Sequence, residues 1–217
     1  MPLIKTIDED NFRCCIWRVT ESMDELYASL PDSVRQAYRD EAQKKFTSEH
    51  RKLEFVAVRA LLQQMWPDAP VVAYHESGKP YLKDSDVYLS VSHTANVVAV
   101  ALSCNEVGID VERYGEKICR VAPRFLNKNE RADGVWQKLL LWSAKETVYK
   151  MMNCREVDFR EHLCSSGLRL GDENQVVGRC GCFQMHTCHP AHCHTYQVRF
   201  EIFPDFVLTY SSVSFDS

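Results

Sequence analysis

The order of the predicted elements places this chain in the α+β class. Two helices come first, followed by a string of short strands, one further helix, and then strands again to the end of the chain. Helices and strands that occur in separate groups, rather than alternating one by one, are typical of this class. A split near residues 104–106 gives halves of similar size, so we expect two units, 1–105 and 106–217.

The first two helices are predicted between Pro31 and Trp66. Asp32 is a candidate N-cap of the first helix, and Ser48 is a weaker candidate for the second. The second helix is the clearer of the two because apolar residues recur at helical spacing, and Pro67 ends it. These apolar residues are Leu53, Phe55, Val56, Ala57, Ala60, Leu61, Leu62 and Met65.

From Val71 onward the pattern changes to short apolar runs separated by turn residues, which predicts strands. The runs read VVAY, DVYLSVSH, NVVAVALS and VGIDVE. A long helix follows, with Asp133 as candidate N-cap and Asn153 as candidate stop. Strand-like patterns then return, with turns at Gly167, at 171–174 and in the Cys/His segment near the C-terminus.

Composition and charge narrow the function classes. The net charge of −4 and the pI near 6.1 give no global electrostatic reason to expect nucleic-acid binding. The N-terminus is charged where a secretory signal needs an apolar stretch, and the longest apolar run, Val97 to Leu102, is too short to span a membrane. The ten cysteines then indicate reduced thiols. We therefore expect a cytoplasmic, monomeric protein.

Two acidic residues share one side of a predicted strand. Asp110 and Glu112 stand two positions apart in VGIDVE, so their side chains point the same way while Ile109 and Val111 point to the opposite face. A pair of this kind is often just a solvent-facing strand edge. Held close together, however, the two carboxylates repel one another, and oxygen ligands of this kind suit Mg²⁺.

A third carboxylate comes from the helix that contains LLLWSAKETVYKMM. Glu146 and Lys150 lie one turn apart on a flank that also includes Ser143, beside Trp142. A surface ion pair would explain Glu146 and Lys150 alone. Beside the acidic strand, they would instead complete a magnesium site with an ammonium near a phosphate. The helix should face the core with Trp136, Leu140, Ala144, Thr147 and Met151.

Several basic residues are candidates for holding phosphate. Lys79 lies in the turn Gly78 to Pro80, and His93 ends a strand in LSVSHTAN. A lone histidine is more often a structural hydrogen-bonding residue, so each candidate is weak by itself. The predicted helices add further positive charge at Lys44, Lys45, Arg51 and Arg59.

Together these segments resemble the 4'-phosphopantetheinyl transferases, in particular the longer single-chain, surfactin-synthetase-activating type. The resemblance follows the order of the motifs RKLEFVAVRALL, ESGKPYL, VYLSVSHT, GIDVE, RFLNKNE and WSAKETVYK, and it spans about Lys44 to Lys150. GID followed by WSxKExxxK is a specific signature. The resemblance implies a pseudo-dimer of two similar α+β halves, each a small sheet with a long helix, with the ligand in the cleft between them.

The resemblance also implies a reaction. Asp110, Glu112 and Glu146 would bind Mg²⁺, or Mn²⁺ in its place, and through it the diphosphate of coenzyme A. A serine of an apo acyl or peptidyl carrier protein would attack the β-phosphate, and 3',5'-adenosine bisphosphate would leave. Lys150 would contact a phosphate and assist the leaving group. Glu146, Glu112 and a metal-bound water are alternatives for the general base. Glu130 falls where the family keeps an acidic residue near the site.

The phosphate candidates take implied roles as well. His93 would touch the 3'-phosphate of coenzyme A, with Lys79 and Arg59 in the surrounding pocket. Lys44 or Lys45 would lie near the place where the phosphates enter.

The chain departs from the family pattern in two places. It has 31 residues between Asp110 and Trp142, fewer than is usual in the longer type, so the loop that helps to hold the carrier is abbreviated. Thr147 replaces the usual Ser or Ala. Since carrier helices are commonly acidic, we also expect a basic patch beside the site. Its candidates are Arg120, Arg124 and Lys128.

The segment from Cys180 to His194 competes with this interpretation. It concentrates cysteine and histidine, which raises the alternative of a zinc-dependent interaction protein, although no standard ligand spacing is met. Pro190 in its middle favours an exposed hairpin turn. A second alternative is a non-catalytic module that binds coenzyme A or a nucleotide.

Overall fold

The computed structural model describes residues 2–68, 70–152, 154 and 156–213. Contacts group the chain into two compact units, and each is described by itself. The first unit comprises Met1–His75 and Pro80–Cys104, and the second comprises Glu76–Lys79 and Asn105–Ser217. The short turn Glu76–Lys79 therefore groups with the second unit, which the sequence did not predict.

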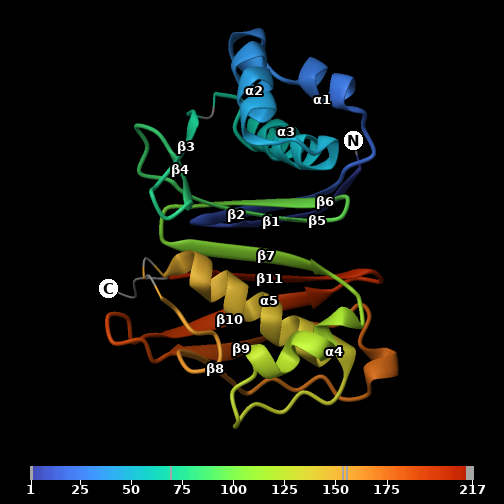
Figure 1. Cartoon of the computed structure of the whole chain (residues 1–217), viewed down its shortest axis with the longest axis vertical. Coiled ribbons are helices and arrows are strands. Elements are labelled where there is room, and N and C mark those ends of the chain that lie inside the picture. Colours follow the sequence, from blue (N-terminus) through green and yellow to red (C-terminus); the bar gives the residue numbers. More distant parts are fainter. Residues whose placement is uncertain (1, 69, 153, 155, 214–217) are drawn as a thin grey trace. The chain divides into compact units, whose positions relative to one another are not determined.

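The first unit is a four-stranded antiparallel sheet with three helices. Its strands lie in the order β1-β2-β6-β5, and β3 and β4 form a separate small hairpin. Helix α3 lies along one face of the sheet, with α1 and α2 packed beyond it (Figure 1). The elements are β1 (Leu3–Glu9), β2 (Phe12–Arg18), α1 (Met23–Ser29), α2 (Asp32–Lys45), α3 (Glu49–Met65), β3 (Val72–Tyr74), β4 (Pro80–Leu82), β5 (Tyr88–Thr94) and β6 (Val97–Ser103).

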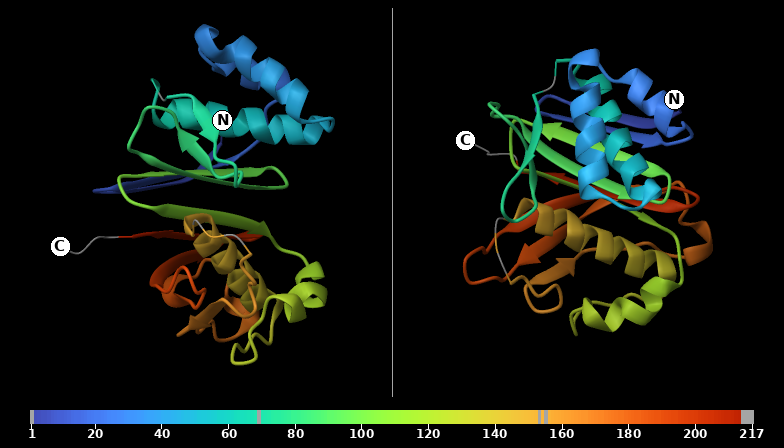
Figure 2. Two further views of the ribbon diagram at one scale, coloured as in Figure 1. Left: turned by 60° about the vertical axis from the view of Figure 1, so that its left-hand side comes forward. Right: turned by 45° about the horizontal axis from the view of Figure 1, so that its top comes forward.

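The second unit is a five-stranded antiparallel sheet in the order β7-β11-β10-β9-β8. Helix α5 packs along this sheet, as both Figure 1 and Figure 2 show. The elements are β7 (Val107–Arg113), α4 (Lys117–Val121), the 3-10 helix η1 (Ala122–Arg124), α5 (Val135–Met151), β8 (Leu163–Ser166), the 3-10 helix η2 (Glu173–Gln175), β9 (Cys180–Thr187), β10 (Thr195–Ile202) and β11 (Phe206–Ser212).

The two units share one order of connection, in which a strand is followed by a long helix and the last strand pairs with that first strand. In the first unit β2 leads to a 17-residue helix, α3, and the last strand, β6, returns beside β2. In the second unit β7 leads to a 17-residue helix, α5, and the last strand, β11, returns beside β7. The α+β class is thus confirmed. Among the described residues, no helix has both the length and the apolar composition needed to cross a membrane.

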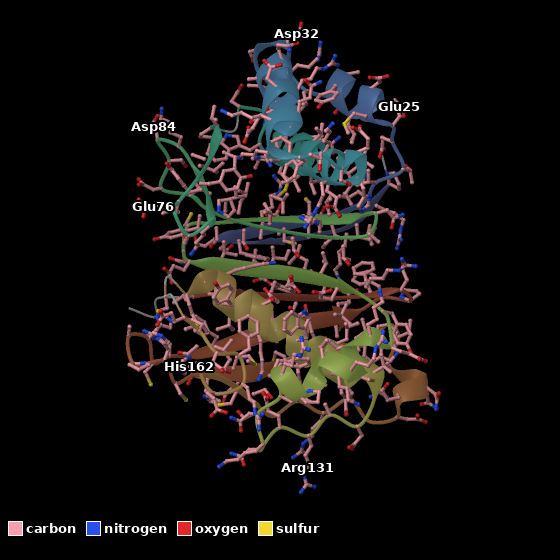
Figure 3. The ribbon with its side chains drawn as sticks, in the orientation of Figure 1. Glu25, Asp32, Glu76, Asp84, Arg131 and His162 are labelled. Atoms are coloured by element: carbon pink, nitrogen blue, oxygen red, sulfur yellow. The ribbon has the colours of Figure 1, made fainter. Side chains whose placement is uncertain are left out.

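Some local predictions in the first unit hold and others do not. The helices α2 and α3 are confirmed, but Pro31 is the N-cap of α2, and Asp32 is its first residue. Ser48 stands at the N-cap of α3 without a side-chain cap bond. The strands β1 and β2 and the helix α1 were not predicted, although Ser22 and Glu25 form a capping box at the start of α1. Figure 3 labels Glu25 and Asp32 at these two helix starts.

The start of α5 also corrects a prediction. Gly134, not Asp133, is the N-cap, and its lack of a side chain leaves no cap bond from that residue. Instead, the carboxylate of Glu173 in η2 accepts the backbone N–H groups of Trp136 and Gln137, at 3.2 Å each. A negatively charged side chain at the N-terminal end of a helix also interacts favourably with the helix dipole. The predicted stop, Asn153, lies outside the described residues.

A turn was predicted in the Cys/His segment, but the whole segment is not a turn. Residues Cys180–Thr187 are strand β9, paired along their length with β10. The turn itself is confined to the residues around Pro190, where His189 and His192 form an isolated bridge. The hairpin expected at Pro190 is therefore confirmed, and the four residues Cys180, Cys182, His186 and Thr187 belong to the sheet.

Gly108 lets β7 and α5 approach closely. A Cβ atom at this position would collide with the backbone oxygen of Thr147 and with Cγ of Met151, both in α5. The approaching neighbour is thus the helix α5.

We predict that Gly108→Ala destabilises the protein by about 2 kcal/mol or more, because a backbone oxygen cannot give way as a flexible side chain can. Chemical denaturation measures this loss, and Gly115→Ala is the matched control because a Cβ there meets nothing within 4 Å. Equal stability of the Gly108 and Gly115 variants would contradict the close approach.

Candidate functional site

The candidate site of the second unit lies where β7 faces α5. Since the Cβ position of Gly108 points at α5, the side chains of Asp110 and Glu112 leave the strand on that same side. Asp110 is only 4% exposed, and Glu112 is partly buried. Glu146 and Lys150, one turn apart on α5, are partly buried as well. The predicted core residues of α5, from Trp136 to Met151, are buried as expected.

Lys150 lies on Asp110. Its ammonium donates to Oδ1 of Asp110 at 2.8 Å and to the backbone oxygen of Ile109, also at 2.8 Å. The lysine therefore anchors the end of α5 to β7 and neutralises the most buried carboxylate of the site. This contact places Lys150 directly beside the acidic strand.

Trp142 orients Glu112, a role that the sequence did not reveal. The indole Nε1–H donates to Oε1 of Glu112 at 2.8 Å. The indole ring itself is fixed between Phe125 and Phe159, with ring centroids 5.1 and 5.4 Å away. One oxygen of Glu112 is thereby held by a rigid group. Ser143, predicted on the flank of Glu146, is instead buried and bonds the hydroxyl of Thr209 at 2.8 Å.

The three carboxylates repel one another. Burial, and then the charge of Asp110, raise the pKa of Glu112 to about 7. The same two causes raise the pKa of Glu146 to about 7. Such shifts show that the side chains are near enough for like-charge repulsion, which a cation among them would relieve.

The donor set suits a hard cation, although the side chains have not converged on a common point. Carboxylate oxygens are the ligands that Mg²⁺ prefers, and it typically uses one or two of them with water and phosphate. Within the described ranges, no three His, Cys, Asp or Glu side chains are gathered as a ready-made metal group. The residues therefore fit a divalent cation by their chemistry and proximity, while rotation of their side chains is still required.

Lys79 joins the second unit through α5. Its ammonium donates to the backbone oxygen of Met151 at 3.5 Å, and burial lowers its pKa. The preceding Gly78 has a φ of +85°, a conformation that favours glycine, so the predicted turn is present. Lys79 thus caps the C-terminal end of the helix that carries Glu146 and Lys150.

A buried ion pair lies behind the carboxylates. Lys145 and Glu130 have side-chain exposures of 0% and 1%, and Nζ lies 2.6 Å from Oε2. The same ammonium donates to the backbone oxygens of Phe125, Phe159 and Leu163 at 2.6, 3.0 and 2.8 Å. Glu130 is thus engaged by the lysine that precedes Glu146. Lys145 was missed, although its spacing from Leu141 and Val148 places it on an apolar row of the helix.

In the first unit, His93 belongs to a cluster around Glu54. The carboxylate of Glu54, buried in α3, lies 3.2 Å from Nδ1 of His93 and 3.2 Å from Nε2 of His50. Its other oxygen lies 3.3 Å from the guanidinium of Arg51. One acid therefore orients three groups that carry or can carry positive charge. His93 was a candidate from the sequence, whereas Glu54 was not.

Two of the remaining basic candidates of the first unit, Arg59 and Lys45, contact Tyr74. Arg59 is only 3% exposed, donates to the Tyr74 hydroxyl at 2.7 Å and stacks on the ring of Phe55. Lys45 bonds Glu41 at 2.5 Å and lies 4.0 Å from the centre of the Tyr74 ring. Arg59 is therefore built into the core of this unit, in contrast to Lys44, which is exposed in the last turn of α2.

Three histidines near the C-terminal hairpin, His162, His186 and His189, have ring nitrogens that take part in hydrogen bonds. His162 and His189 each accept a backbone N–H at Nδ1, from Asp158 and from Ala191. A neutral ring that accepts at Nδ1 carries its proton on Nε2, so neither nitrogen is ready to bind zinc. His186 lies between the hydroxyls of Ser166 and Thr195. The zinc alternative thus finds no support from the geometry of these rings.

Comparison with known proteins gives two findings. The family model of the 4'-phosphopantetheinyl transferase superfamily matches residues 106–200. The chain is also 33% identical over 84 residues to a protein of Aneurinibacillus migulanus named 4'-phosphopantetheinyl transferase gsp. That alignment covers 35% of this chain and 35% of the relative, so the chain matches about a third of the relative's length.

Proposed function

Since residues 106–200 belong to the 4'-phosphopantetheinyl transferase superfamily, we propose that this chain transfers the 4'-phosphopantetheine arm of coenzyme A to a serine of an apo carrier protein. The observation that carries the proposal is the meeting of Asp110 and Glu112 on β7 with Glu146 and Lys150 on α5. All four lie inside the matched segment. The proposal places the reaction in the cytoplasm.

We assign Asp110, Glu112 and Glu146 as the residues that hold Mg²⁺, or Mn²⁺ in its place. When bound, the cation would neutralise the charge of the coenzyme A diphosphate. The carboxylates would hold it from two elements, the strand and the helix, that Gly108 allows to pack closely. Trp142 fixes the direction of Glu112 by donating to one of its oxygens.

The chain's own groups then position and activate the reactants. Lys150 stabilises the charge that develops on the leaving phosphate. When coenzyme A binds, the ammonium of Lys150 leaves Asp110 and contacts a phosphate instead. Glu146 or Glu112 accepts the proton of the serine hydroxyl. Most of the remaining catalysis comes from the alignment of hydroxyl and phosphate.

In this proposal, coenzyme A binding also involves Lys79 and basic residues of the first unit. His93, oriented by Glu54, contacts the 3'-phosphate. Lys79, Lys44 and Lys45 supply further positive charge for the phosphates. Arg59 acts through Tyr74, whose hydroxyl it fixes. The pseudo-dimer with a ligand cleft, which the resemblance implies, is part of the same proposal.

We predict that His93→Ala weakens coenzyme A binding more than dephospho-coenzyme A binding, because only the former carries the 3'-phosphate. A charge-assisted hydrogen bond of this kind contributes about 1.5–3 kcal/mol, or roughly 10-fold to 150-fold in affinity. Isothermal titration with both donors measures the difference. His50→Ala is the matched control, because His50 bonds the same carboxylate, and it should keep the preference for coenzyme A. An equal loss of affinity for both donors in the His93 variant would show that His93 does not contact the 3'-phosphate.

We also predict that added salt weakens the carrier interaction. Arg120, Arg124 and Lys128 are exposed around α4 and η1, and surface charges attract an acidic carrier helix less as screening increases. The KM for the carrier protein should rise as sodium chloride is added. The KM for a short peptide that contains the acceptor serine should change less. A carrier KM indifferent to salt would indicate an apolar interface.

Mass spectrometry tests the proposed function directly. Apo carrier proteins of several pathways are incubated with the chain, coenzyme A and Mg²⁺, and the carrier should gain the mass of phosphopantetheine on its serine. Addition of a chelator should stop the gain. Binding of coenzyme A without any gain, across all carriers, would favour the non-catalytic module instead.

A further inference from the structure

The hairpin that joins β9 to β10 sets Cys188 directly opposite Cys193. On the strand side of this pair, the N–H of Thr187 donates to the backbone oxygen of His194 at 2.8 Å, which continues the register of β9 and β10. The next position on each strand is a cysteine. The two cysteines therefore follow the paired strands without a bulge between them and the sheet.

A two-residue turn closes the hairpin on the other side of the cysteine pair. His189 and His192 form a bridge, and the N–H of His192 donates to the backbone oxygen of His189 at 2.8 Å. Pro190 and Ala191 lie between them, and proline favours this position of a tight turn. The turn fixes the register of a hairpin. Both neighbouring pairs thus place the two cysteines opposite each other.

The kind of pairing brings the two side chains close together. The N–H of Cys188 donates away from the hairpin, to the backbone oxygen of His162 at 2.8 Å. His162, just before β8, is labelled in Figure 3. Cys188 and Cys193 are therefore a non-hydrogen-bonded pair, and such pairs hold their Cα atoms about 4.5 Å apart. A disulfide needs about 4.4–6.8 Å between Cα atoms, so the backbone of the thiol form suits the bond.

Both thiols point to solvent on one face of the hairpin. Thr187, the residue before Cys188, is only 1% exposed. Because side chains alternate along a strand, Cys188 points to the opposite side, and Cys193 across from it shares that face. Both cysteines are free and exposed. A small reagent can therefore reach either sulfur.

The turn beside the cysteines is anchored on both strands. Nε2 of His192 lies 2.5 Å from the hydroxyl of Tyr196, a buried residue of β10. The ring of His189 packs edge-on against the ring of His162, with centroids 4.9 Å apart. The hairpin thus holds the two thiols opposite each other. Reactants held in place in this way react with each other faster than with a second molecule from solution.

Cys164 on β8 is the competing partner of Cys188. It lies opposite His186, so Cys188 is its diagonal neighbour. Diagonal neighbours are about 7–8 Å apart, which exceeds the roughly 4.4–6.8 Å between the Cα atoms of a disulfide. Cys164 is also partly buried, whereas Cys193 is exposed. The register therefore favours Cys193 over Cys164.

We propose that Cys188 and Cys193 are a redox-active pair that forms a reversible disulfide, with a small-molecule disulfide such as oxidised glutathione as oxidant. The thiolate of Cys188 attacks one glutathione sulfur, forms a mixed disulfide and releases one glutathione thiolate. The thiolate of Cys193 then attacks the Cys188 sulfur and releases the second. The two protons of the protein thiols pass through solvent to the two glutathione thiolates. This modification site does not rest on the proposed transferase function.

Peptide mapping of the full-length protein tests the proposal. The reduced protein is equilibrated in glutathione buffers of increasing oxidised fraction, and the remaining thiols are blocked by alkylation. Digestion with trypsin and chymotrypsin then releases the peptide 184–196, whose cysteines are Cys188 and Cys193 alone. We expect this peptide to change from two alkyl groups to none, with a mass two hydrogen atoms below that of the dithiol. Dithiothreitol should restore both alkylation sites.

Serine variants separate the two cysteines from their neighbours. Cys193→Ser should abolish the internal bond and leave a glutathione adduct on Cys188 that dithiothreitol removes. Cys182→Ser is the matched control, because Cys182 is another exposed thiol of β9 but lies opposite Arg199, and it should keep the bond. Cys164→Ser should keep the bond as well. Circular dichroism verifies that each variant folds.

Three outcomes in the wild-type protein would overturn the proposal. The first is alkylation of both cysteines in peptide 184–196 at every oxidised fraction. The second is a glutathione adduct on this peptide that persists without forming the internal bond. The third is a cross-link between Cys188 and Cys164. If a serine variant is unfolded, the wild-type peptide map alone decides, because it requires no substitution.

Discussion

Glu146→Gln is expected to lose at least about 100-fold in the rate of phosphopantetheine transfer, with the fold unchanged. The substitution removes one negative charge where Asp110 and Glu112 already gather, and it keeps the shape of the side chain. It removes both a ligand of the cation and a candidate acceptor for the serine proton. The mass gain of an apo carrier over time measures the rate, and thermal unfolding by circular dichroism measures the fold.

The glutamine variant also has a clear control. Glu116 is an exposed acid beside α4, so Glu116→Gln changes the net charge equally without touching the site, and its transfer rate should match the wild type. If Glu146→Gln keeps nearly full activity, Glu146 is not the third ligand. A loss of folded protein in place of a loss of rate would assign Glu146 to stability.

Lys145→Met should have the largest effect on stability, about 3–5 kcal/mol. The substitution leaves Glu130 without its cationic partner in a site where its side chain is 1% exposed. It also leaves the backbone oxygens of Phe125, Phe159 and Leu163 without the ammonium that they share. Methionine fills most of the volume, so the loss reflects charge and hydrogen bonds and not a cavity. Urea denaturation measures it as a lower midpoint.

Lys138→Met is the matched control for this variant. Lys138 lies on the same helix, is partly exposed, and donates to the backbone oxygens of Asp133 and Gly134 near the start of α5. Its substitution should cost within about 0.5 kcal/mol. A cost below about 1 kcal/mol for Lys145→Met would mean that the pair contributes nothing beyond what a well-packed apolar side chain supplies.

Periodicity predicted the parts of the fold that bury one continuous face. Helix α3 was visible because its apolar residues recur at helical spacing up to Pro67, and β7 was visible because Ile109 and Val111 alternate with acids. Elements set by distant contacts were missed. Strand β1 alternates poorly and carries charges, and α5 begins at Gly134 because Glu173, almost forty positions later, satisfies its first N–H groups.

The candidate site likewise contains residues that local spacing predicted and contacts between distant residues that it did not predict. Asp110, Glu112 and Glu146 were predicted from their spacing on two elements, which is local information. The partners that orient them were not. Trp142 holds Glu112 only because α5 packs on β7, and Lys145 reaches Glu130 only because the segment after α4 folds over the helix. Such contacts join residues 15 and 30 positions apart and have no periodic signature.

We propose that Asp110, Glu112 and Glu146 converge on one divalent cation, and Mn²⁺ binding is the sharpest test of this claim. The signal of free Mn²⁺ in electron paramagnetic resonance is followed as the protein is titrated in with coenzyme A present. We predict one bound ion per wild-type chain and its loss in Asp110→Asn. Unchanged Mn²⁺ binding in that variant would contradict the claim.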